Sequence, residues 1–84
     1  MTDVHRELLE LFRDVFEDDQ MLVEEGMESS DIAGWDSLAH INLLIAAEKR
    51  FGIRFTVAEM SRLKQPGQTV GSLRELIESK IAAR

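Results

Sequence analysis

The sequence predicts a single all-α domain, spanning residues 1–84, with three longer helices and one short third helix. Apolar residues recur at three- and four-residue spacing in separate stretches, which is typical of helices that bury one face. Capping residues precede these stretches, and no convincing strand pattern appears. A long connection between the first and second helices completes the expected four-helix bundle.

The first helix is expected from about Asp3 to Asp18. Either Thr2 or Asp3 can cap it, because both side chains accept hydrogen bonds from free N–H groups of a first turn. Its apolar row, with the neighbours that widen it, consists of Val4, Leu8, Leu11 and Val15 with Leu9, Phe12 and Phe16. This row should form one wall of the core.

The connection that follows, residues 19–35, is too long to be structureless in a small domain. Five apolar residues should hold it against the helices: Met21, Leu22, Val23, Met27 and Ile32. Its acids should lie in water: Glu24, Glu25, Glu28 and Asp31.

The second helix is expected from about Ser37 to Arg50. Gly52 can adopt the left-handed conformation that often ends a helix, and Lys49 and Arg50 suit its negative pole. The row expected to be buried is Leu38, Ile41, Leu44 and Ile45.

Two capping signals place the remaining helices. Thr56 and Glu59 fit a capping box, which predicts a short third helix at about 57–63, and the turn at 66–67 then stops it. Thr69 caps a last helix at about 70–82. Its core row reads Val70, Leu73, Ile77 and Ile81, with Leu76 beside it.

The formal net charge of −6 argues against nucleic-acid binding, because phosphates would meet a repulsive surface. The charge is uneven: residues 1–36 hold 12 acids and 2 arginines, whereas residues 37–84 hold 4 acids and 8 lysines or arginines. Such asymmetry can steer partners toward one side. We expect basic protein partners and a monomer.

The chain has no cysteine, which excludes a disulfide framework, a thiolate metal site and a cysteine nucleophile. Any thiol chemistry must therefore come from a cofactor. No stretch reaches the length of an apolar membrane span, and the first residues lack the features of a signal peptide. The expected compartment is the cytoplasm.

The stretch Gly34-Trp35-Asp36-Ser37-Leu38 puts a serine at the start of an amphipathic helix, directly after an acid. An Asp or Ser in this place is, by itself, the ordinary signature of a helix N-cap. The same placement leaves a serine hydroxyl exposed and open to modification. The residues around the motif decide between the two interpretations.

With the residues that follow it, GWDSLAHINLLIAAEKRFGI, the motif resembles the acyl carrier protein family, and the resemblance extends over nearly the whole chain. It implies that Ser37 carries a covalent 4′-phosphopantetheine arm, derived from coenzyme A, that holds acyl groups as thioesters. It also implies a shuttle rather than an enzyme, served by a phosphopantetheinyl transferase and by acyl-loading and acyl-processing enzymes. In the family, Asp36 matters to the transferase, and Leu38 both anchors the helix and meets partners.

The exposed face of the second helix departs from the carriers of bacterial fatty acid synthesis, which usually have acids there. This chain has Ala39 and Asn42 instead, and only Glu48 is acidic. The connection at 64–68 is also lengthened. We therefore expect a specialised discrete carrier of a polyketide-like or other dedicated pathway, whose partners are recognised through Asp36, Leu38, Ala39, Asn42 and Glu48.

Phe55, Met60 and Leu63 lie where family members can shelter an acyl chain. Ordinary core packing explains the same residues, and Met60 is adaptable enough to yield space. Both interpretations stay open from sequence.

Three other functions could use a serine at this position. A hydrolase with a Ser37 nucleophile lacks the Gly-x-Ser-x-Gly elbow, and His40 is expected to be a partly exposed surface residue. No metal site is expected, because His5, a surface residue, and His40 lie on different helices.

A peptidyl carrier usually has a second glycine where Trp35 stands, and Trp35 is expected to anchor the loop. A non-covalent helical adaptor, with Ser37 only as a cap, remains an alternative.

Overall fold

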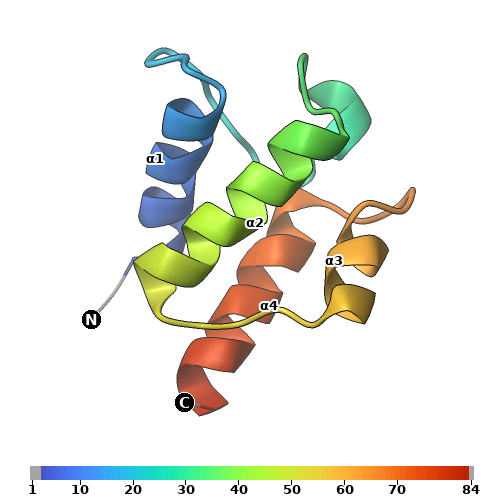
Figure 1. Ribbon diagram of the computed structural model, residues 1–84. Helices are drawn as coiled ribbons and strands as arrows, with labels where there is room; N and C mark the ends of the chain where they lie inside the picture. The colour runs from blue at the N-terminus through green and yellow to red at the C-terminus, as the bar shows by residue number, and fades with distance from the viewer. Residues whose placement is uncertain (1–2, 84) are drawn as a thin grey trace.

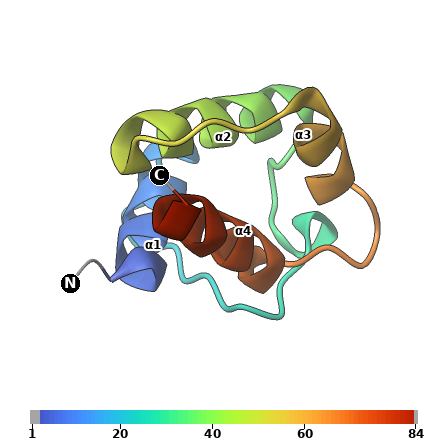
Figure 2. The ribbon, with the colours of Figure 1, turned by 90° about the horizontal axis from the view of Figure 1, so that it is seen from below.

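The computed structural model describes residues 3–83, which form four α-helices and one short 3₁₀ turn (Figure 1). In chain order the elements are α1 (Val4–Val15), η1 (Ser29–Asp31), α2 (Ser37–Phe51), α3 (Val57–Leu63) and α4 (Val70–Ala83). The three longer helices surround the core, and short α3 stands beside the start of α2 (Figure 2). The predicted all-α class and the order of the helices are confirmed.

Helix α1 begins where the sequence predicts, because the Asp3 carboxylate accepts a hydrogen bond of 3.1 Å from the Arg6 N–H. It ends at Val15, earlier than the expected Asp18. The reason lies in Glu17, whose φ of 52° is left-handed and turns the chain out of the helix. The Asp18 N–H then bonds to the Arg13 carbonyl and closes the end.

Helix α2 buries a different row from the predicted one. Its buried residues are His40, Leu43, Leu44, Ala47 and Phe51. Leu38, Ile41 and Ile45 are exposed instead, Leu38 by 67%. Both rows have helical spacing, so periodicity cannot choose between them. The choice is made by packing against α1 and α4, and three of the four residues predicted to be buried there were assigned wrongly.

The long connection is pinned to the start of α4, which lies between the connection and α2 in Figure 2. Val70 donates its N–H to the Met27 carbonyl at 2.8 Å, and Gly71 donates to the Glu25 carbonyl at 2.9 Å. A Cβ on Gly71 would lie only 3.2 Å from that Glu25 oxygen, so any larger residue would push the connection away by a few tenths of an ångström.

The apolar anchors of the connection are fewer than predicted. Val23 and Ile32 are buried, and Met21 and Met27 are half-buried against the core. Leu22 is 72% exposed, so its prediction is wrong. The two backbone hydrogen bonds from α4 to Met27 and Glu25 anchor the connection, whereas the exposed Leu22 side chain does not.

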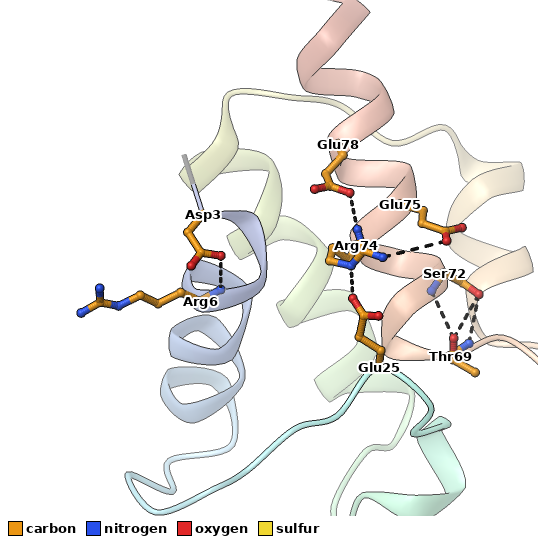
Figure 3. A network of polar contacts seen from close by, with 8 residues as sticks. All are labelled: Asp3, Arg6, Glu25, Thr69, Ser72, Arg74, Glu75 and Glu78. Atoms are coloured by element: carbon orange, nitrogen blue, oxygen red, sulfur yellow. Dashed lines mark hydrogen bonds and ion pairs between the residues drawn. The ribbon is translucent and has the colours of Figure 1, made fainter. Parts of the chain in front are cut away.

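Three of the acids predicted to lie in water have partners, and the first, Asp31, accepts a hydrogen bond of 2.9 Å from the Glu28 N–H. Arg74 on α4 forms ion pairs with Glu25 of the connection and Glu78 one turn on (Figure 3). Half-buried Glu28 accepts a hydrogen bond of 2.8 Å from the Gly67 N–H. The contacts of Glu25 and Glu28 fasten the connection to α4 and to the loop before it.

The predicted caps of the later helices are confirmed. The Thr56 hydroxyl accepts from the Glu59 N–H at 3.1 Å, and the Glu59 carboxylate accepts from the Thr56 N–H at 2.8 Å. Gly52 ends α2 with a left-handed φ of 66°. Thr69 starts α4 by accepting from the Ser72 N–H at 3.1 Å (Figure 3).

Across residues 3–83, no helix combines the length and the apolar character that crossing a membrane requires.

The Glu59 carboxylate should make part of the stability pH-dependent. Its ion pair with Lys80, at 2.8 Å, and the Thr56 N–H hold the pKa of Glu59 below the ordinary value of 4.5. A folded-state pKa below the unfolded value stabilises the fold above pH 4.5, and this stabilisation is lost as the pH falls through the folded pKa. The melting-temperature difference between wild type and Glu59→Gln should therefore shrink between about pH 6 and about pH 3.

Glu24→Gln is the matched control, because no ion pair of Glu24 occurs within residues 3–83. A melting-temperature difference between wild type and Glu59→Gln that stays constant with pH would contradict the lowered pKa of Glu59.

Candidate functional site

Ser37 is the first residue of α2, and its side chain is exposed. The preceding Asp36 is the N-cap: its carboxylate accepts a hydrogen bond of 2.8 Å from the Ala39 N–H. Asp36 therefore does the capping, and the Ser37 hydroxyl is not needed to start the helix. Of the two residues in the motif, Asp36 is therefore the helix cap, and the hydroxyl of Ser37 is left exposed and open to modification.

Trp35 fixes the chain just before this cap. Its half-buried ring packs edge-on against Phe12 of α1 at 5.3 Å between centroids, and Phe16 lies 6.0 Å away. These contacts anchor the end of the long connection to α1, as predicted. The position of Ser37 is thus set by α1 as well as by its own helix.

His40 is 4% exposed, which corrects the expectation of a partly exposed surface residue. Its Nδ1 accepts from the Trp35 indole N–H at 3.2 Å, and its Nε2 lies 2.9 Å from the Met60 carbonyl. An indole can only donate and a carbonyl can only accept, so the ring proton is on Nε2. Burial is possible because both ring nitrogens are satisfied, and His40 is not available as a base for Ser37.

A hollow of about 240 Å³ opens between α2 and α3 beside the serine. It is lined by Ser37, His40, Ile41, Val57, Met60, Ser61 and Lys64. Lys64, at the end of α3, donates a hydrogen bond from Nζ to the Ser37 Oγ. The serine hydroxyl therefore lies at the rim of a partly apolar hollow with one cation beside it.

The three residues predicted to form an acyl pocket are not brought together in this hollow. Phe55 and Leu63 are buried in the core, and only Met60 is among the lining residues. The apolar lining comes instead from Ile41 and from Val57, which is 81% exposed. An apolar residue in the exposed first turn of α3 was the signal that sequence reasoning passed over.

The residues predicted to meet partners are placed unequally. Leu38 and Asn42 are exposed, and Ala39 is half-buried. Glu48 is half-buried, and its carboxylate accepts a hydrogen bond of 2.8 Å from the Phe55 N–H. Its carboxylate therefore serves the turn after α2, while Glu48 also lines a hollow at that end of the helix.

Within the described part of the chain, no group of three or more His, Asp or Glu side chains is arranged to hold a metal ion. The chemistry of the site rests on the serine hydroxyl, its neighbouring carboxylate and the lysine.

The chain is similar in structure to holo acyl carrier protein from Geobacter metallireducens, determined by solution NMR. The TM-score is 0.84 and the sequence identity is 33%, and the alignment covers 98% of this chain and 90% of the other. No family model and no curated protein matches the sequence.

Replacing the buried imidazole should destabilise the protein. In His40→Phe the Trp35 N–H and the Met60 carbonyl both lose their partner, and each unsatisfied buried group costs about 1–3 kcal/mol. We expect the free energy of unfolding, measured by urea denaturation with circular dichroism, to fall by about 2–3 kcal/mol. His5→Phe, on the exposed side of α1, should change it by less than about 0.5 kcal/mol. Equal losses for the two variants would contradict the described role of His40.

Proposed function

Because the chain belongs to the acyl carrier protein family, we propose that Ser37 is the attachment point of its 4′-phosphopantetheine arm and that it serves a dedicated acyl or polyketide-like pathway. The observation that carries the proposal is the exposed Ser37 hydroxyl, which lies at the start of α2 and at the rim of the hollow between α2 and α3. The carrier function itself follows from the family. Carrier proteins are not enzymes, and their partner enzymes perform the chemistry.

The residues around Ser37 fit a phosphodiester. The first turn of α2 has free backbone N–H groups and a positive pole, which favour a phosphate by about 0.3–1 kcal/mol at an exposed site. The Asp36 carboxylate would repel the phosphate, but it is bonded to the Ala39 N–H. Lys64 supplies a positive charge on the other side of the hydroxyl. Ile41 and Val57 line the adjoining hollow and offer apolar surface.

When bound, the arm supplies a terminal thiol that holds acyl groups as thioesters, a chemistry that this cysteine-free chain cannot provide by itself. The chain contributes the rigid base. Asp36 fixes the first turn, and Trp35 fixes the segment before it. Tethering presents the cargo to each partner at a high effective concentration.

The partners proposed are a phosphopantetheinyl transferase and acyl-loading and acyl-processing enzymes. Asp36 and Leu38 flank the serine, and the 67% exposure of Leu38 supports direct contact with them. The exposed strip of Leu38, Ile41 and Ile45 continues this apolar surface along α2. Asn42 is exposed and Ala39 half-buried, so both remain candidates for contact.

The charge of α2 supports a specialised pathway. Glu48 is the one acid in the sequence of this helix, and its carboxylate is bonded to the Phe55 N–H. At the far end, the two cations Lys49 and Arg54 line a second hollow of about 530 Å³ together with Ile45 and Glu48. An enzyme that recognises a row of acids on this helix would find an apolar strip and cations instead.

Incubation with coenzyme A, magnesium and a broad-specificity phosphopantetheinyl transferase should add one phosphopantetheine to the intact mass. Ser37→Ala should abolish the gain, because the attachment oxygen is missing. Ser61→Ala is the matched control, since Ser61 is an exposed serine that lines the same hollow, and it should load normally. A gain that survives Ser37→Ala would refute the assignment.

The pathway proposal predicts poor processing by the fatty acid synthase enzymes of the host. Asn42→Glu adds an acid to the exposed face of α2. It should raise the kcat/KM of these enzymes by about two- to fivefold, which is the effect of one exposed ion pair between carrier and enzyme. Ser79→Glu, an exposed position on α4, should not change it. Wild-type protein that is loaded and elongated as well as the host's own fatty acid carrier would refute the dedicated pathway.

A further inference from the structure

Lys64 gives the attachment site a charged partner from a distant part of the chain. It is the residue that ends α3, 27 positions after Ser37, and its Nζ donates to the Ser37 Oγ. We propose that in the loaded protein Lys64 pairs with the phosphodiester on Ser37 and holds the base of the arm toward α3. This inference rests on the proposed attachment at Ser37.

The charges around the hydroxyl support an ion pair at this place. Of the described residues that line the hollow, Lys64 alone carries a formal charge, because the His40 ring is held as a neutral imidazole by Trp35 and Met60. Asp36, directly before Ser37, is negative. A phosphodiester would add a second negative charge, and Lys64 is the cation placed to offset both.

The contact changes its nature when the serine is modified. In the unmodified protein it joins two exposed side chains, and such contacts contribute little to stability. In the modified protein the Ser37 oxygen becomes an ester oxygen, a weaker acceptor. The charged phosphate oxygens then lie one phosphorus atom further out, and hydrogen bonds to charged acceptors are about twice as strong as neutral ones. Lys64 needs only a small movement to exchange one acceptor for the other.

The backbone fixes where the lysine begins. The Lys64 N–H bonds to the Ser61 carbonyl at 3.2 Å, which tightens the last turn of α3. The loop after it is held at its far end, because the Gly67 N–H donates to the Glu28 carboxylate at 2.8 Å. The lengthened 64–68 connection is therefore tied down at both ends, and the base of the Lys64 side chain stays beside the hollow.

The test compares unmodified and loaded forms of wild type, Lys64→Gln, Lys64→Arg and Lys49→Gln. Intact mass first establishes that each loaded sample carries one arm. Loading should raise the melting temperature of wild type by about 2–4 °C more than that of Lys64→Gln. Lys64→Arg keeps the cation and should retain most of the increment. Lys49→Gln removes a cation from the other end of α2 and should behave as wild type.

Two further measurements separate an ion pair from a general packing effect. The ³¹P chemical shift of the arm should differ between wild type and Lys64→Gln, and should be unchanged in Lys49→Gln. On loading, the melting temperature of wild type should rise more than that of Lys64→Gln at low salt. This difference should largely disappear in about 0.5 M salt, which screens exposed charges. Full loading with equal increments in wild type and Lys64→Gln would overturn the role of Lys64 while leaving the attachment site intact. A mass that does not change on incubation with the transferase would overturn both.

Discussion

The imidazole of His40 joins three parts of the molecule at a point where water is excluded. It receives a hydrogen bond from Trp35 at the end of the long connection, and its other nitrogen bonds to the Met60 carbonyl of α3. A buried ring of this kind is stable only when both nitrogens have partners, so connection, α2 and α3 must be in place together. Helix α3 buries only Leu63 among its seven residues, and this polar link and the Glu59–Lys80 ion pair both help to attach it. The hollow beside Ser37 depends on it.

Helix α2 is apolar on two sides, and each side has its own task. One row, which includes Leu43, Leu44 and Ala47, forms the centre of the core. The other row, Leu38 and Ile41 with Ile45, lies in water at the cost of some solubility. An exposed apolar strip next to the proposed attachment site suits a surface that meets several partners in turn. The same helix thus supports the fold and, in the proposed function, presents the cargo.

Local chemistry was predictable from the sequence, and the choice between packing arrangements was not. The capping box of Thr56 and Glu59 and the left-handed Gly52 gave the correct helix ends, because neighbouring residues determine those contacts. The buried face of α2 was predicted wrongly, since two rows share one period. The burial of His40 was missed for a related reason: one of its partners, the Met60 carbonyl, comes from α3, 20 residues further along the chain. The pairing of Lys64 with Ser37 likewise exists only after α3 has packed beside α2.

The uneven distribution of charge along the chain has a role in the fold, since three ion pairs among residues 3–83 join its two oppositely charged parts. Arg50 pairs with Glu7 and Glu10, and Arg74 pairs with Glu25. The same attraction acts in the denatured chain, where no fixed contact is needed for opposite charges to draw the two segments together. A more compact denatured ensemble exposes less new surface on unfolding, which lowers the denaturant dependence of stability. It also shortens the search for the contacts between the acidic first part and the basic second part, so the charge pattern acts on the folding reaction before any helix has docked.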